Sequence, residues 1–122
     1  PRLVAYGFAP DEDYVDLLRR ADIVVSTADH EFFGIAIVEA MAAGAFPVLP
    51  NRLVYPERLP KAHHGRCLYD DTPSLVSRVR WALENRAAAT GIGNDLAKTV
   101  EKYDWREVAP AYDAVLGSLV TE

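Results

Sequence analysis

The segment His-Glu-Phe-Phe-Gly-Ile-Ala-Ile-Val-Glu-Ala-Met, residues 30–41, decides how the rest of the chain is interpreted. Two carboxylates, Glu31 and Glu39, flank a glycine and an otherwise apolar stretch that predicts a buried helix. An ionised carboxylate is costly to bury unless hydrogen-bond donors surround it, and residues 40–49 contain no basic side chain. We therefore expect a ligand that carries hydroxyl groups to be the partner of Glu39.

The expected helix geometry suggests which ligand this is. A helix that begins near Phe33 would place Glu39 about 9 Å along its axis, at 1.5 Å per residue. The free N–H groups of Phe33, Gly34 and Ile35 would then lie between the carboxylates, at a helix end that favours anions such as phosphate. Gly34 has no Cβ, so a ligand can approach the backbone. This order of sites predicts a nucleotide sugar; the alternative is that Glu31 caps a helix and Glu39 finds a donor in the core.

Short apolar runs alternate with helical patterns along the chain, which is typical of βαβ units and a mostly parallel sheet. The expected strands are Leu3–Phe8, Ile23–Ser26, Phe46–Leu49 and Arg66–Tyr69. The expected helices begin at a cap on Asp11, near Phe33 with an end at Gly44, at Thr72–Pro73 with Leu75, Val79 and Leu83 inward, and at Asp104. The predicted fold class is therefore α/β and Rossmann-like, with helices flanking the sheet.

A pair of glycines and a proline in the second half of the chain also affect the expected helices. Gly91-x-Gly93 resembles half of a dinucleotide fingerprint, but Leu96 stands where its third glycine belongs and no strand precedes it. We expect a loop between two helices there.

Pro110 should kink the last helix, because proline removes a backbone hydrogen bond and crowds the preceding turn.

The residues around the two glutamates resemble the signature of a known enzyme family. Glu31, seven intervening residues and Glu39, in the setting Glu-Phe-Phe-Gly…Glu-Ala-Met-Ala-Ala-Gly, are similar to the motif of retaining GT-B glycosyltransferases of the glycogen-synthase-like group. Segments 6–8, 21–26 and 46–49 fall where that family's donor-binding domain has its counterparts. Segments 26–34 and 50–57 resemble the tRNA-queuosine mannosyltransferase branch and its bacterial relatives. The resemblance covers residues 3–119.

The resemblance implies that residues 1–122 are part of the C-terminal, donor-binding domain of a GT-B enzyme. In the family, two further strands and a helix-bearing segment with a basic Arg/Lys pair come before the counterpart of Leu3–Phe8. A separate N-terminal domain supplies the acceptor site. We therefore expect an enzyme fragment that is inactive alone.

The resemblance also assigns roles to residues of the motif. Glu39 would accept the ribose hydroxyls of the nucleotide, and Glu31 would lie near the transferred sugar as the catalytic candidate. Backbone N–H groups of Phe33, Gly34 and Ile35 would contact the sugar and the diphosphate, as a preorganised donor array does.

Three more residues are candidates for donor binding. His30 directly precedes Glu31, and an ordinary loop histidine is the alternative interpretation. Asn51 and Arg52 follow a predicted strand, at the carboxyl edge where open α/β sheets bind ligands. Arg52 would either assist the diphosphate or pair with Glu57.

No metal and no cofactor besides the donor is expected. The position four residues after His30 is Gly34 rather than the second histidine of a zinc motif, and the adjacent His63 and His64 would point apart. The GT-B family generally works without a bound metal. The branch resemblance implies GDP-mannose as donor and queuosine in tRNA as acceptor.

Bulk properties limit the partners and the compartment. The net charge of −5 argues against binding of a polyanion through the overall field, so a tRNA would be held mainly by protein outside this chain. The single Cys67 cannot form an internal disulfide and indicates a reducing cytoplasm. Residues 32–49 approach a membrane-spanning length, but Glu39 within them would cost about 2.5–3.5 kcal/mol on insertion scales. We therefore expect no membrane segment.

A function of another class remains as the alternative. The chain would then be a non-catalytic Rossmann-like module that binds a nucleotide or a protein partner. The pair Glu31 and Glu39 argues against it, whereas the absence of the family's upstream strands from residues 1–122 argues for it.

Overall fold

A parallel three-stranded sheet organises the domain in the computed structural model, which describes residues 2–120 with the side chain of residue 105 left out. The strands are β1 (Ile23–Val25), β2 (Phe46–Pro50) and β3 (Leu68–Tyr69), in the order β1-β2-β3. Ile23 lies opposite Phe46, and Leu49 lies opposite Leu68. All residues of β2 are buried, as expected of a central parallel strand. The predicted α/β, Rossmann-like class is confirmed.

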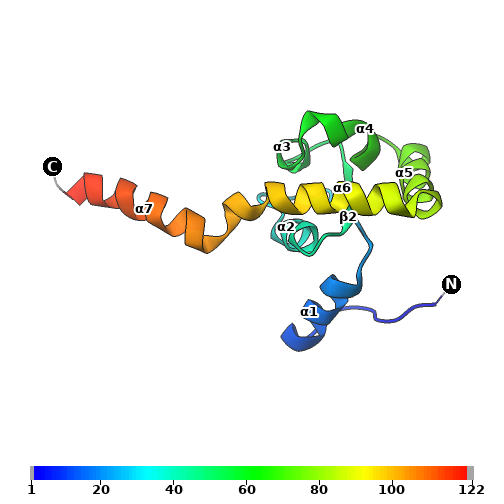
Figure 1. The fold of residues 1–122 in the computed structure, drawn as a ribbon, viewed down its shortest axis with the longest axis horizontal. Coiled ribbons are helices and arrows are strands. Elements are labelled where there is room, and N and C mark those ends of the chain that lie inside the picture. Colours follow the sequence, from blue (N-terminus) through cyan, green and yellow to red (C-terminus); the bar gives the residue numbers. More distant parts are fainter. Residues whose placement is uncertain (1, 121–122) are drawn as a thin grey trace.

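Helices of very different lengths surround this sheet. They are α1 (Asp11–Arg20), α2 (Ile35–Ala42), α3 (Tyr55–Arg58), η1 (Lys61–His63), α4 (His64–Cys67), α5 (Thr72–Glu84), α6 (Arg86–Thr99), η2 (Glu101–Tyr103) and α7 (Trp105–Val120). Figure 1 shows α6 crossing the middle of the molecule between α2 and the group formed by α3, α4 and α5. α1 lies to one side, and α7 extends away from the body of the domain.

The core lies between β2 and the helices α2 and α6. Its largest fully buried side chains are Tyr55, Phe46, Met41, Leu49 and Leu96. Trp81 on α5 packs against the ring of Phe46, with ring centroids 5.8 Å apart. These buried side chains lie beneath the start of α2 and the ends of β1 and β2.

The glycine pair of α6 corrects one expectation. Gly91 and Gly93 lie inside this helix rather than in a loop. A Cβ on Gly93 would stand 2.3 Å from the carbonyl oxygen of Gly44, whereas one on Gly91 would meet open space. Gly44 itself has a φ of +93°, directly after α2. Gly93 therefore allows α6 to approach the turn between α2 and β2, and it does not break the helix.

The first expected strand is wrong. Residues 3–8 form no strand, and Tyr6 and Phe8 are each 94% exposed. An extended segment becomes a strand only when a neighbour pairs with its backbone, and no described strand pairs with this one. The last expected strand, Arg66–Tyr69, is reduced to Leu68–Tyr69, because residues up to Cys67 complete α4.

Helix ends follow the sequence more closely. α5 begins at Thr72 as predicted, and Asp71 and Ser74 form a reciprocal capping box at its start. Asp11 is the first residue of α1 rather than its cap, which is Pro10. Leu83 on α5 is 56% exposed rather than inward. In the described part of the chain, no helix has the length and apolar character needed to cross a membrane.

Candidate functional site

The start of α2 lies beside the carboxyl ends of β1 and β2. α2 begins at Ile35, two residues later than expected, with Gly34 as its N-cap in the left-handed conformation (φ +80°). The N–H of Val38 donates to the carbonyl of Gly34 at 2.9 Å, which is the first bond of the helix. The N–H groups left without helical acceptors are therefore those of residues 35–37, rather than those of residues 33–35.

Glu31 closes the loop that leads into this helix. Its Oε1 accepts hydrogen bonds from the N–H groups of Phe32, at 3.2 Å, and Gly34, at 3.1 Å. The N–H of Gly34 is thus already bonded within the loop. Glu31 therefore does not cap α2, as the alternative had it, but closes the loop before the helix. In the part of the chain that the structure describes, the second oxygen accepts no hydrogen bond.

Glu39 is exposed, which corrects the expectation that it is buried in an apolar helix. α2 buries Ile37, Ala40 and Met41, while Ile35 and Glu39 lie on its open side. An almost entirely apolar helix gives no signal of which face packs on the sheet, because polar residues normally mark the outer face. Because the carboxylate of Glu39 is exposed to solvent, it does not need a hydrogen-bond donor to offset a cost of burial.

A protein hydroxyl nevertheless reaches Glu39. The hydroxyl of Tyr14, on α1, donates to Oε2 of Glu39 at 2.5 Å. This hydrogen bond, followed by desolvation and the carboxylate charge, raises the pKa of Tyr14 to about 12. The carboxylate is thus oriented to accept an O–H group.

Glu39 lies one helical turn from the free N–H groups at the start of α2. Glu39 lies four residues after Ile35, about 6 Å along the axis at 1.5 Å per residue, and on the same face. Helical side chains lean toward the N-terminus, which directs this carboxylate toward the open helix end. Glu39 also lines a hollow between α2 and α6, together with Asn94 and Lys98.

The loops after β1 and β2 are tied together by Arg52. Its guanidinium donates to the carbonyl of Ala28 at 3.0 Å and to Oδ1 of Asp29 at 3.3 Å. The ion pair is thus made with Asp29 and not with Glu57, the partner weighed from the sequence. Both loops lie at the carboxyl edge of the parallel sheet, as predicted. His30, in the first of them, is exposed.

Asn51 is also occupied by a neighbouring loop. Its side-chain amide donates to Oδ1 of Asp70 at 3.0 Å, and its backbone N–H donates to the carbonyl of Tyr69 at 2.8 Å. Asn51 therefore links the end of β2 to the end of β3. It lies at the same edge as Arg52, and both residues were placed there from the sequence.

A buried hydroxyl cluster supports these loops from below. The hydroxyls of Ser26 and Tyr55 are 2.9 Å apart, and the hydroxyl of Tyr69 donates to the carbonyl of Ser26 at 2.7 Å. The ring of Tyr55 would lie 3.5 Å from a Cβ on Gly34. Tyr55 is therefore a packing residue beneath the site, since only 1% of it is exposed.

The histidine pair does not form a site. Nε2 of His64 lies 2.8 Å from the carbonyl oxygen of Leu59 and 3.1 Å from that of Pro56. Because carbonyl oxygens only accept hydrogen bonds, this nitrogen carries a proton and donates to them. These hydrogen bonds of His64 connect the first residue of α4 to α3 and to the residue that follows α3.

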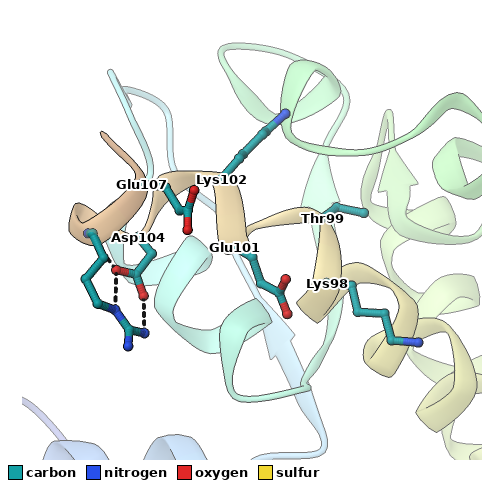
Figure 2. Close-up of a pocket in the computed structure, with 7 residues that line it drawn as sticks. Lys98, Thr99, Glu101, Lys102, Asp104 and Glu107 are labelled. Carbon is teal, nitrogen blue, oxygen red and sulfur yellow. Dashed lines mark hydrogen bonds and ion pairs between the residues drawn. The ribbon is translucent and has the colours of Figure 1, made fainter. Parts of the chain in front are cut away.

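A charged hollow at the junction of α6, η2 and α7 contains none of the predicted site residues (Figure 2). Arg106 pairs with Asp104 at 2.7 Å, and its hydrogen bonds lower the pKa of Asp104 to about 2. Figure 2 shows Lys98 and Lys102 pointing in different directions, so their charges do not converge on one ligand position.

The family can be stated from comparison with known proteins. The profile of the family described as Glycosyl transferases group 1 matches residues 2–102. The chain belongs to this family. No solved structure matches it.

Three relatives illustrate the group 1 glycosyltransferases that this chain resembles. The tRNA-queuosine alpha-mannosyltransferase of Drosophila melanogaster is 45% identical over 78 residues, covering 64% of this chain and 20% of that protein. The GDP-mannose:cellobiosyl-diphosphopolyprenol alpha-mannosyltransferase of Xanthomonas campestris is 31% identical over 112 residues, covering 87% and 30%. The sulfoquinovosyl transferase of Arabidopsis thaliana is 28% identical over 89 residues, covering 70% and 18%. The chain thus spans between about a fifth and a third of their lengths.

Several residues around the glycosyltransferase motif were not found from the sequence. Tyr14, Arg58 and Tyr103 were not singled out as site residues. The structure brings Tyr14 to Glu39, and Arg58 and Tyr103 to Phe33. No local signal could have found these pairs, because 25 or more residues separate the partners in each.

Proposed function

We propose that this chain binds the nucleotide-sugar donor of a retaining GT-B glycosyltransferase. The observation that carries the proposal is the start of α2, where N–H groups without helical acceptors lie one turn from Glu39. The left-handed Gly34 turns the backbone into this helix end, where a phosphate is favoured. Membership of the glycosyltransferase family supports the same site.

Glu39 accepts the ribose hydroxyls in this proposal. The Tyr14 hydroxyl already donates to its Oε2, and a ribose hydroxyl is the same type of donor. The donor either displaces Tyr14 or shares the carboxylate with it, since a carboxylate offers several acceptor positions. Exposure of Glu39 makes the carboxylate accessible to a ligand.

Glu31 and the helix N-terminus hold the sugar and the diphosphate. The second oxygen of Glu31 faces the transferred sugar, while the first keeps the loop closed. The N–H groups of residues 35–37 bind the diphosphate, which favours departure of the nucleotide. His30, Asn51 and Arg52 border the same edge and complete the donor site.

The donor is GDP-mannose and the acceptor is queuosine in tRNA, again as proposals. One relative is named for GDP-mannose and another for tRNA-queuosine, and both are mannosyltransferases. The acidic chain does not hold the tRNA, because a net charge of −5 repels a polyanion. The single buried Cys67 fits a cytoplasmic protein without disulfides.

Calorimetric titration of the full-length protein with GDP, UDP and GDP-mannose tests donor binding. Heat should appear for GDP and GDP-mannose, and Glu39→Gln should weaken both at least tenfold. Losing a hydrogen bond to a charged group costs about 1.5–3 kcal/mol, or roughly ten- to a hundredfold in affinity. Glu84→Gln, an exposed glutamate at the end of α5, is the matched control. Equal affinities for both variants would refute the role of Glu39.

A second assay tests the acceptor. GDP-mannose with a radiolabelled sugar is incubated with the full-length protein and tRNA that contains or lacks queuosine. Label should enter only the queuosine-containing tRNA. If the protein binds the nucleotide but transfers no sugar to either tRNA, the proposed acceptor is refuted, whereas the proposed donor site is not.

A further inference from the structure

A cation in contact with two aromatic rings joins three distant segments next to the predicted donor site. Arg58 is the last residue of α3, and Tyr103 is the last residue of η2. The guanidinium carbon of Arg58 lies 4.1 Å from the ring centre of Phe33 and 4.9 Å from that of Tyr103. The two rings meet edge to face, with centroids 5.3 Å apart. We call Phe33, Arg58 and Tyr103 the arginine clamp.

Hydrogen bonds fix the orientation of the guanidinium within the clamp. Nε of Arg58 donates to the carbonyl oxygen of Phe33 at 3.0 Å, and Nη1 donates to the hydroxyl of Tyr103 at 2.8 Å. A planar guanidinium can donate to both acceptors from fixed positions while it contacts the rings, which the compact ammonium of a lysine cannot do.

The bonded carbonyl belongs to the peptide between Phe33 and Gly34. A peptide unit is planar, so fixing its C=O also fixes its N–H on the opposite side. That N–H, on Gly34, donates to Oε1 of Glu31 at 3.1 Å. The two ends of one peptide unit are therefore held by Arg58 and by Glu31.

This peptide unit sets the geometry of the donor site. Gly34 has a left-handed backbone and directly precedes α2, so its orientation determines where the N–H groups of residues 35–37 point. The same unit directs the carboxylate of Glu31. Rotation of the peptide would therefore misplace the proposed sugar and diphosphate contacts together.

We infer that Arg58, supported by Tyr103, is a positioning residue that holds Glu31 and the start of α2 in the arrangement that the donor requires. The inference deepens the proposed function and rests on it for its kinetic consequence. Arg58 acts through the Phe33–Gly34 peptide and does not touch the donor. Positional errors of about 1 Å in a catalytic arrangement can cost a hundredfold in rate.

Hydrogen exchange of the full-length protein tests the structural step without any ligand. Within residues 32–38, Arg58→Met should speed exchange of the hydrogen-bonded amides of Phe32, Gly34 and Val38 at least tenfold and leave the amides of β2 unchanged. Tyr103→Phe removes only the hydroxyl and should give a smaller increase in the same peptides. Arg80→Met, on the exposed side of α5, is the matched control and should change neither segment. Unchanged exchange in residues 32–38 of folded Arg58→Met and Tyr103→Phe would overturn the inference.

Steady-state kinetics test the functional step in the same variants. For Arg58→Met and Arg58→Lys, kcat should fall at least tenfold, and KM for the nucleotide sugar should also rise, because the diphosphate contacts are displaced together with Glu31. A tenfold rise in the dissociation constant of the nucleoside diphosphate with unchanged kcat would instead make Arg58 a ligand contact and overturn the positioning role. If the wild-type protein neither binds nor transfers a nucleotide sugar, the proposed function fails, and the exchange data still decide whether Arg58 holds the loop.

Discussion

Replacing Gly93 by alanine should destabilise the protein, although alanine is the better helix former. Gly93 lies inside α6, where it faces the turn between α2 and β2. The new Cβ would stand 2.3 Å from the carbonyl oxygen of Gly44, with the backbone of Ala45 also within 3.4 Å. Real Cβ atoms essentially never come closer than 3.0 Å to another heavy atom, so α6 must move outward by about 0.7 Å.

The magnitude follows from two opposing terms. Glycine to alanine in a helix gains about 0.5–1 kcal/mol, because alanine loses less backbone entropy on folding. Forcing an extra methyl group into a packed contact costs about 1–3 kcal/mol. Since the obstacle is backbone rather than a flexible side chain, we expect the cost to exceed the gain. The net change is a loss of about 1–2 kcal/mol.

Gly91→Ala provides the matched control. Gly91 lies in the same helix, two residues before Gly93 and on a different face, and a Cβ there meets open space. This variant should keep the gain of about 0.5–1 kcal/mol without the clash. Urea unfolding followed by tryptophan fluorescence measures both, and the difference between the variants isolates the contact with Gly44. Equal stability of the two alanine variants would refute the close approach of α6 to Gly44.

The other predictions concern single side chains. Tyr69→Phe removes the buried bond to the Ser26 carbonyl and should cost about 1–3 kcal/mol in unfolding experiments, whereas Tyr6→Phe, at a site 94% exposed, should cost nothing; equal effects would contradict the buried cluster. Burial raises the pKa of the Cys67 thiol from 9.0 to about 12. Because the thiolate is the reactive form, a thiol reagent at neutral pH should label it roughly a thousandfold more slowly than a free cysteine, and rapid labelling of the folded protein would show that Cys67 is accessible. The hydrogen bond to Glu39 raises the pKa of Tyr14 from 10.0 to about 12, so its stabilisation is complete below pH 10 and lost as the pH rises through 12. Ultraviolet difference titration against Tyr14→Phe should find this ionisation near pH 12 and, in Glu39→Gln, nearer 10; an unchanged value in Glu39→Gln would exclude the contact.

The central strands and the main helices could be predicted from local pattern. Ile23–Ser26 and Phe46–Leu49 were placed within one residue of β1 and β2, because buried parallel strands are short, continuous apolar runs between turn residues. The start of α5 at Thr72 followed from its proline, which is tolerated in the first turn. The two-glutamate segment 30–41 was sufficient to identify the family.

The errors share one cause, which is contact between residues far apart in the chain. Residues 3–8 have the composition of a strand, but pairing requires a neighbour that composition does not supply. Gly93 was taken for a loop residue because glycine weakens a helix, and only the approach of Gly44 explains it. Glu39 was expected to be buried because its helix is apolar on every side.

The sequence by itself determined the two central strands, the helix between them and the start of α5, since these depend on short-range periodicity, and it contains the spacing of the two glutamates. Tertiary packing decided which face of α2 is covered, and therefore that Glu39 is open and bonded to Tyr14. It also brought Arg58 and Tyr103 to the peptide before Gly34. Such contacts close loops of 25 residues or more, and the free energy that selects them comes from the whole packed core rather than from any local stretch of sequence.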